Sequence, residues 1–120
     1  MDGSAALPSP TVDAKQFFDL DIRAGTVLSC EPFPEARTPA YRLLIDFGEL
    51  GTRRSSARLT DLYTPEQLVG TTVIGVVNLP PRQVGPVRSE VLVLGVYQRG
   101  TGHVVLLRPE KDCAPGDRVG

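Results

Sequence analysis

The stretch that decides the fold is TPEQLVGTTVIGVVNL, residues 64–79. Thr64 precedes a proline at the first helical position and Gln67 at the third, a pattern that caps a helix because both side chains bond free backbone N–H groups. Gly70 ends this short helix. The residues that follow are mostly apolar and hardly alternate with polar ones, which is typical of a buried strand. A short helix leading into a core strand is therefore the first element that the sequence predicts.

Further strand-like segments lie on both sides of this helix. The whole set is 22–33, 41–48, 52–59, 71–79, 90–97 and 103–108. Their connections are rich in Gly, Pro, Asp and Thr, as turns are, and Gly25 and Gly75 suit the sharp coiling of strands in a small barrel. Three strands, a helix and two or three more strands are the order of a five-stranded OB-fold barrel. We therefore predict an all-β OB fold, which the position of the helix favours over a plain β-sandwich.

The N-terminal region reads differently from the strands. The residues DAKQFFD, 13–19, predict a short helix that Asp13 caps. Residues 1–12 contain two prolines and no long apolar run, so we predict a flexible arm there. Residues 13–120 then form a single domain, as is expected for a chain of this length.

Three of the predicted strands carry apolar residues on both faces. They are VIGVVNL, VLVLGVY and VVLLR, at 73–79, 91–97 and 104–108. A barrel of this size covers only the inner face of its strands, so the outer faces need another cover. The terminal segments of the chain are short, which makes a second copy the better candidate. We therefore predict a homodimer, with cover by the chain's own ends as the alternative.

The composition and the N-terminal sequence indicate the cellular compartment of the protein. No stretch approaches the roughly 20 apolar residues that span a bilayer, so we expect no membrane insertion. The N-terminus does not resemble a signal peptide, and we expect a cytoplasmic protein. Two cysteines, Cys30 and Cys113, occur without a secretory signal, so we expect them to be reduced rather than paired.

The sequence offers no catalytic constellation. His103 is the single histidine and opens an apolar run, which is typical of a strand end, and there is no CxxC pair to hold a metal. The glycines at 95, 100 and 102 fit a hairpin loop better than a nucleotide cradle. No nucleophile stands beside an evident base. We therefore predict a binding module without a cofactor or a metal, and not an enzyme.

The positive charge of the chain is concentrated in its middle. Residues 37–108 carry nine arginines, no lysine and five acidic residues, although the net charge of the whole chain is −1. Arginine bonds phosphate in a forked geometry and stacks on bases, which lysine does not do. A solvated surface explains the same composition, and a strongly basic binder would have a higher isoelectric point than the 5.8 of this chain.

Several motifs resemble those of the CsaA family, small bacterial chaperones linked to protein export. They are LDIRAGTV, FPEARTPAYRLLIDFG, SSARLT, VVNLPPR, SEVLVLG and VVLLRP, and together they span roughly 17–120. The resemblance implies an OB-fold homodimer that binds unfolded or exported polypeptides. It also implies a surface related to the tRNA-binding domains attached to methionyl- and phenylalanyl-tRNA synthetases.

The loop after the fourth strand carries part of this resemblance. The tRNA-binding relatives share several residues of this loop with the present sequence. They are Asn78, Leu79, Pro81 and Arg82, followed by the basic Arg88 and by Ser89. Two departures occur. Leu92 stands where those relatives have methionine, and Pro86 stands where they have glycine. Both departures make tRNA binding a weaker prediction and leave the chaperone prediction untouched.

The predicted function is that of an ATP-independent chaperone for unfolded or export-destined polypeptides, with a tRNA-binding module as the alternative. The predicted binding residues are Asn78, Arg82, Arg88, Ser89, Glu90 and Leu92, with Phe33, Arg37 and Tyr41 from the second motif. Simpler interpretations of these residues remain open. The arginines are then solvated loop charges, the Ser89 hydroxyl bonds backbone, Glu90 pairs with a neighbouring arginine, and Phe33 and Tyr41 are core or interface residues.

Overall fold

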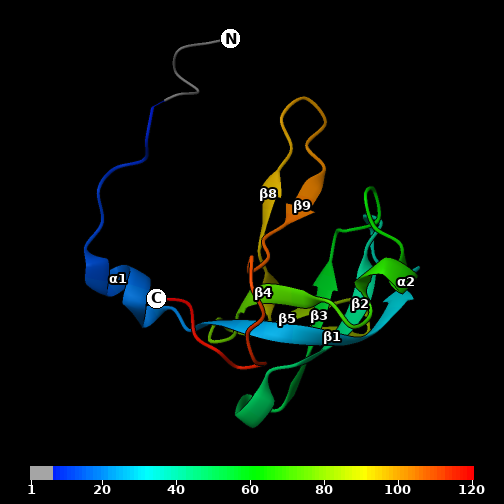
Figure 1. The fold of residues 1–120 in the computed structure, drawn as a ribbon. Helices are drawn as coiled ribbons and strands as arrows, with labels where there is room; N and C mark the ends of the chain where they lie inside the picture. The colour runs from blue at the N-terminus through cyan, green and yellow to red at the C-terminus, as the bar shows by residue number, and fades with distance from the viewer. Residues whose placement is uncertain (1–6) are drawn as a thin grey trace.

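The structure, a computed structural model, describes residues 7–120. Its helices are α1 (Ala14–Asp19), the 3-10 helix η2 (Gly48–Leu50) and α2 (Pro65–Leu68). Its strands are β1 (Ile22–Pro32), β2 (Tyr41–Asp46), β3 (Thr52–Ala57), β4 (Thr72–Val76), β5 (Arg82–Val84), β6 (Val87–Ser89), β7 (Leu92–Val93), β8 (Gly95–Tyr97) and β9 (Val104–Leu106). Figure 1 shows a barrel of strands from which the β8–β9 hairpin projects, with α1 standing to one side.

Five strands form the barrel, in the order β3-β2-β1-β4-β7, and all neighbours are antiparallel. The long strand β1 serves two neighbours, because Ile22–Thr26 pairs with β4 and the part from Thr26 onward pairs with β2. A register shift between Val27 and Ser29 marks the bend where the strand changes partner. The sheet is nearly closed, which confirms the predicted all-β, five-stranded OB barrel.

Helix α2 lies between β3 and β4, as the sequence predicts. The Thr64 N–H donates to Gln67 Oε1 at 2.9 Å, and the Gln67 N–H donates to Thr64 Oγ1 at 3.3 Å. Together these two bonds form the predicted capping box. The helix places Leu68, which has no exposed surface, in the core of the barrel. Its position is therefore set by the cap at one end and by burial of this leucine at the other.

The core is filled by apolar side chains from every barrel strand, with Ile45 and Phe47 wholly buried at its centre. Gly25 and Gly75 make room for them. A Cβ atom at Gly25 would lie 2.6 Å from Ile45 Cγ2 and from the ring of Phe47, and one at Gly75 would lie 2.5 Å from Val91 Cγ1. The two glycines thus let coiled strands approach the core closely.

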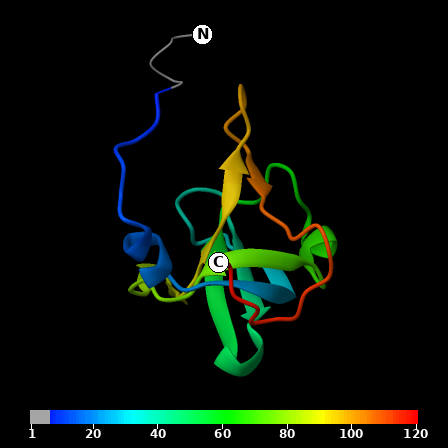
Figure 2. The same ribbon diagram turned by 60° about the vertical axis from the view of Figure 1, so that its left-hand side comes forward.

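Two predictions about the strands after β4 are wrong in detail. The single strand expected at 90–97 is divided at Leu94, whose N–H donates to Ile74 O at 2.8 Å. Beyond it, β8 leaves the barrel and pairs with β9 in a separate hairpin, which Figure 2 shows edge-on. The segment after the fourth strand, expected as a loop, forms a second hairpin, β5–β6, whose turn contains Gly85 at φ 54°.

The N-terminal helix α1 forms as predicted, with the Asp13 N–H donating to Gln16 Oε1. None of its residues is buried, and residues 7–12 before it are exposed and form no helix or strand. The rest of the predicted arm, residues 1–6, lies outside the described residues, so the division into a flexible arm and one domain stays a prediction. Within 7–120, no helix is long and apolar enough to cross a bilayer.

Candidate binding site

The loop between β1 and β2 surrounds a mostly apolar recess of about 410 Å³, here called the loop hollow. Its walls include three prolines and two aromatic rings, with one arginine among them: Pro32, Pro34, Pro39, Phe33, Tyr41 and Arg37. The structure thus brings together the three residues that the sequence predicts for this loop. Phe33 and Tyr41 are only 3% and 9% exposed, so they form the floor of the hollow and also belong to the interior.

Hydrogen bonds hold the shape of the loop hollow. The Phe33 N–H donates to Ala40 O at 3.1 Å, which closes the loop, and Tyr41 Oη donates to Tyr63 O at 2.7 Å. Burial raises the pKa of the Tyr41 hydroxyl, which therefore remains a neutral donor at physiological pH. The prolines restrict the backbone further, because each one fixes its φ angle.

A second recess of similar volume, here called the hairpin groove, lies between the β5–β6 hairpin and the outer face of β1, β2 and β3. Its polar lining comprises Arg42, Arg54, Glu31 and Ser29, and Pro86 and Val87 close it from the hairpin side. Neither Arg42 nor Arg54 is among the binding residues that the sequence predicts. A signal was present for Arg42, since it alternates with the buried Leu43 and Ile45 and so must point outward from its strand.

The side chain of Arg42 lies at the border between the two recesses. Its Cζ atom is 5.9 Å from the centroid of the Phe33 ring, a distance at which a guanidinium and an aromatic face attract each other. Its Nη2 is 3.6 Å from Glu31 Oε2. Its Nε is buried and has no hydrogen-bond partner among residues 7–120.

Ser89 and Glu90, two predicted binding residues, contact the backbone of β3. The Ser56 N–H donates to Ser89 Oγ at 3.1 Å, and the Arg54 N–H donates to Glu90 Oε1 at 3.0 Å. The buried hydroxyl of Ser55 donates in turn to Val91 O at 2.8 Å. These bonds join β3 to the segment before β7, where the barrel would otherwise stay open. The structural interpretation of Ser89, a hydroxyl bonded to backbone, therefore describes its observed contact.

The two loop arginines are exposed on the β5–β6 hairpin. Arg82 is paired in register with Ser89, and Arg88 with Gln83, so the arginine side chains point to opposite faces of the hairpin. The hairpin therefore does not bring them together on one surface. Leu92 lies on β7, is 53% exposed and lines neither recess.

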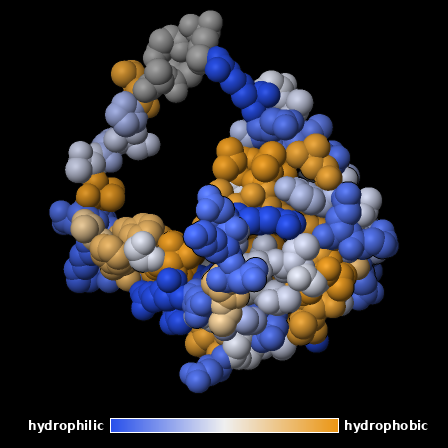
Figure 3. All heavy atoms as spheres, in the orientation of Figure 1, coloured by the Kyte–Doolittle hydropathy of each residue, from blue (hydrophilic) through white to orange (hydrophobic). Residues whose placement is uncertain are grey.

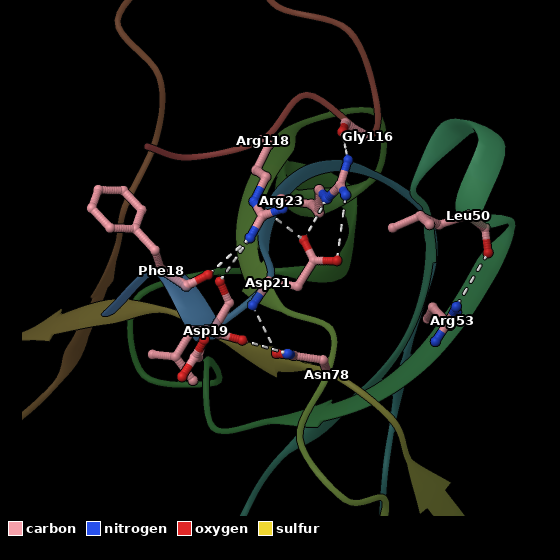
Figure 4. Close-up of polar contacts among 10 residues, drawn as sticks. Phe18, Asp19, Asp21, Arg23, Leu50, Arg53, Asn78, Gly116 and Arg118 are labelled. Carbon is pink, nitrogen blue, oxygen red and sulfur yellow. Dashed lines mark hydrogen bonds and ion pairs between the residues drawn. The ribbon is translucent and has the colours of Figure 1, made fainter. Parts of the chain in front are cut away.

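Asn78 takes part in a cluster that holds the ends of the domain together (Figure 4). Its side chain accepts from the Asp21 N–H and donates to Asp19 O, both at 2.8 Å. The Asp21 carboxylate accepts from Arg23, which also donates to Gly116 O in the C-terminal segment. The Arg23 guanidinium thereby lowers the pKa of Asp21. We call this group the terminal clasp. It gives Asn78 a structural role.

Arg118 joins the terminal clasp from the other end of the chain. Its Nη2 donates to Phe18 O at 3.1 Å, and its Nε lies 3.9 Å from Asp21 Oδ1. The C-terminal segment thereby contacts the end of α1 (Figure 4).

Elsewhere in the described residues, Cys30 is buried and Cys113 exposed, both as free thiols.

Comparison with known proteins connects this geometry to a family. The family model described as "Putative tRNA binding domain" matches residues 22–118. The structure of the chaperone CsaA of Bacillus anthracis is similar, with 47% identity, a TM-score of 0.87, and coverage of 92% of this chain and 100% of that one. The CsaA chaperone protein of Picrophilus torridus has 39% identity, a TM-score of 0.85 and the same coverage.

Among curated relatives, the methionine–tRNA ligase of Porphyromonas gingivalis is 39% identical over 88% of this chain. The chain spans only 15% of the length of that enzyme. The two CsaA proteins, in contrast, are matched over their whole length. The chain therefore belongs to the putative tRNA binding domain family and, within it, to the CsaA proteins.

Proposed function

We propose that this protein is an ATP-independent, CsaA-like chaperone of the cytoplasm, which binds unfolded or export-destined polypeptides and catalyses no reaction. The observation that carries the proposal is the loop hollow. It is mostly apolar, contains Arg37 in its lining and is open to solvent. Unfolded chains expose apolar side chains that folded proteins bury, and an apolar recess with a polar rim suits such ligands. The similarity to proteins described as chaperones supports the same conclusion.

The stiffness of the loop favours binding. Pro32, Pro34 and Pro39 limit its backbone freedom, so little conformational entropy is lost when a polypeptide docks. The floor is equally rigid, because Tyr41 is held by its bond to Tyr63. A preformed recess of this kind needs no nucleotide to open or close it.

The proposed assembly is a homodimer with two-fold symmetry. In the single chain, apolar side chains remain exposed on β7, on β8 and just after β9, namely Leu92, Val96, Tyr97 and Leu107, with Tyr97 81% exposed. Phe17 and Phe18 of α1 pack edge to face and are exposed as well. Figure 3 shows apolar residues gathered on α1 and around the β8–β9 hairpin on one face of the molecule.

The helix α1 gives a second argument for the dimer. A helix of six residues with nothing buried gains little stability from its own hydrogen bonds. Packing of its two phenylalanines against a second copy would supply the missing burial. A stable contact of this kind buries at least about 1,000 Å² in total.

The chaperone proposal is tested by suppression of aggregation of a denatured model protein, run beside a thermal melt. We expect the wild-type protein to suppress aggregation without ATP. Ala36→Asp places a carboxylate in the lining of the loop hollow and should reduce suppression several-fold at an unchanged melting temperature. Ala114→Asp, a matched change in the exposed C-terminal segment, should have no effect. A wild-type protein that suppresses nothing would overturn the proposal.

A second candidate function, tRNA binding, is favoured by the hairpin groove. Arg42 and Arg54 lie together there on the outer face of an OB barrel, and the family model is described as a tRNA-binding domain. Filter binding of tRNA at several salt concentrations tests it. Each lost phosphate contact should flatten the logarithmic salt dependence by about 0.7 to 0.9, so Arg42→Gln and Arg54→Gln together should flatten it by about twice that amount. An unchanged slope excludes the groove as the RNA site.

A further inference from the structure

The loop hollow and the hairpin groove share a wall. Phe33 lines the first, Arg42 lines the second, and the guanidinium carbon of Arg42 lies 5.9 Å from the centre of the Phe33 ring. The strand register places the two linings on consecutive pairs whose side chains point to opposite faces of the sheet, so the recesses meet only at the Phe33–Arg42 contact. Glu31 pairs with Arg42 in the groove, and the next pair along the ladder, Pro32 with Tyr41, lies in the hollow. An extended ligand that crosses this contact would touch both recesses.

Arg42 has donors left for a ligand. Its Nε is buried without a hydrogen-bond partner among residues 7–120, so a ligand would approach the part of the guanidinium that stays exposed, in a side chain that is 39% exposed as a whole. Its other contact, to Glu31 at 3.6 Å, joins side chains that are 39% and 65% exposed. An ion pair at that exposure contributes little stability, so an incoming anion can replace it.

The charge of the combined lining favours an acidic ligand. Three arginines, Arg37, Arg42 and Arg54, face the two recesses, against the single carboxylate of Glu31. Complementary charge of this kind selects among partners and speeds their association. The apolar part of the lining requires that the ligand also carry an apolar group.

Exposure of the aromatic rings distinguishes a polypeptide from RNA. Bases of single-stranded RNA stack on exposed aromatic faces, but Phe33 and Tyr41 are almost fully buried. A phosphate contact at Arg42 would leave the proline-lined hollow empty, since a nucleotide backbone offers no apolar side chain to fill it. A polypeptide supplies both an apolar side chain and a carboxylate.

We propose that the two recesses together bind one extended polypeptide segment, in which an apolar side chain enters the loop hollow and a nearby Asp or Glu carboxylate pairs with Arg42 in the hairpin groove. The inference rests on the proposed chaperone function and names its substrate class, polypeptides in which apolar and acidic residues lie close together. In an extended segment, residues two apart point the same way and are separated by about 6.6 Å. A spacing of two residues is therefore close to the 5.9 Å between the Arg42 guanidinium carbon and the centre of the Phe33 ring.

The test is fluorescence anisotropy with the full-length chain and three labelled peptides of equal length. Each carries one Phe in a Gly-Ser background and, two residues further on, Glu, Gln or Lys. We expect the Glu peptide to bind about fivefold more tightly than the Gln peptide at low salt, and the Lys peptide most weakly. Arg42→Gln should remove the preference while the affinity for the Gln peptide stays the same. Lys111→Gln, which removes an exposed positive charge from the C-terminal segment, should preserve the preference.

A second variant keeps the test decisive if Arg42→Gln fails to fold. Glu31→Gln removes the carboxylate that competes for Arg42, so it should tighten binding of the Glu peptide about twofold and leave the Gln peptide unaffected. If the Glu31–Arg42 pair were purely structural, Glu31→Gln would not increase the affinity for the Glu peptide alone.

The outcomes separate this inference from the proposed function. If all three peptides bind with equal affinity through their Phe, the inference is wrong and the chaperone proposal stands. If no Phe peptide binds and no aggregation is suppressed, both fail. If a single-stranded RNA oligomer displaces the Glu peptide and Arg42→Gln abolishes only RNA binding, the groove is a phosphate site and the inference is overturned.

Discussion

Glu90 forms two hydrogen bonds with the backbone of Arg54. Its N–H donates to Arg54 O at 2.8 Å, and its carboxylate accepts from the Arg54 N–H at 3.0 Å. A strand neighbour would offer a backbone carbonyl to that N–H, and here a side chain replaces it. The residue therefore helps close the barrel between β3 and β7, where no regular ladder forms.

This relationship predicts that Glu90→Ala destabilises the fold. The change leaves the Arg54 N–H without its acceptor, which should lower the free energy of unfolding by about 1 to 2 kcal/mol. Glu90→Gln keeps an acceptor oxygen at the same place and should cost less. Urea denaturation measures both. A Glu90→Ala protein with unchanged stability but lost polypeptide binding would instead place Glu90 in the binding site.

The terminal clasp predicts a contribution to stability that disappears in acid. Hydrogen bonding to Arg23 holds the pKa of Asp21 below its ordinary value of 3.8. The stabilisation is therefore present above the unfolded-state pKa and is lost as the pH falls through the lower pKa of the folded state. Thermal melts between pH 6 and pH 2.5 should show a steeper acid loss for the wild-type protein than for Asp21→Asn. Parallel curves would mean that this ion pair contributes nothing to stability.

The proposed dimer predicts a change of mass when α1 loses its apolar surface. Replacing Phe17 and Phe18 together by serine should shift the protein from dimer to monomer at micromolar concentration, because both rings are exposed in the single chain. Sedimentation equilibrium reports the mass directly. Leu62→Ser, at another exposed apolar position, is the matched control and should stay dimeric. A monomeric wild-type protein contradicts the proposal.

The two cysteines should differ in reactivity. Burial raises the pKa of the Cys30 thiol to about 11, with smaller contributions from Glu66 and Glu31, so almost no thiolate forms there at pH 8. Cys113 is exposed. A disulfide reagent at pH 8 should therefore titrate one thiol quickly in the native protein and two after denaturation. Rapid reaction of both thiols in the folded state would show that the barrel opens near Cys30.

Much of the fold could be predicted because its signals are local. The capping box at Thr64 and Gln67 depends on four consecutive residues, so the start of α2 could be predicted from local sequence, while burial of Leu68 fixes the helix on the barrel. Four of the five barrel strands were predicted from largely apolar runs bounded by turn residues, whereas β3 is largely polar. The prediction of one strand over 90–97 was wrong at Leu94. The apolar run continues through this residue, but the backbone turns out of the barrel there.

The candidate site was only half predictable. Phe33, Arg37 and Tyr41 were predicted together from one motif that resembles the CsaA family, and the hollow is built from the loop that carries this motif. Arg42 was missed, since its significance depends on a contact with Phe33 and on a hairpin that folds back over it. Ser89 and Glu90 were selected by resemblance, but their partners lie more than 30 residues away on β3.

The sequence by itself determined the order of the helices and strands of the barrel along the chain and the two capped helices, because each element depends on residue spacing within one segment. Only the tertiary structure decided which arginine borders the hollow, which polar side chains close the barrel and where the chain leaves it. Those outcomes depend on hydrogen bonds and packing between distant segments, which local propensity does not encode.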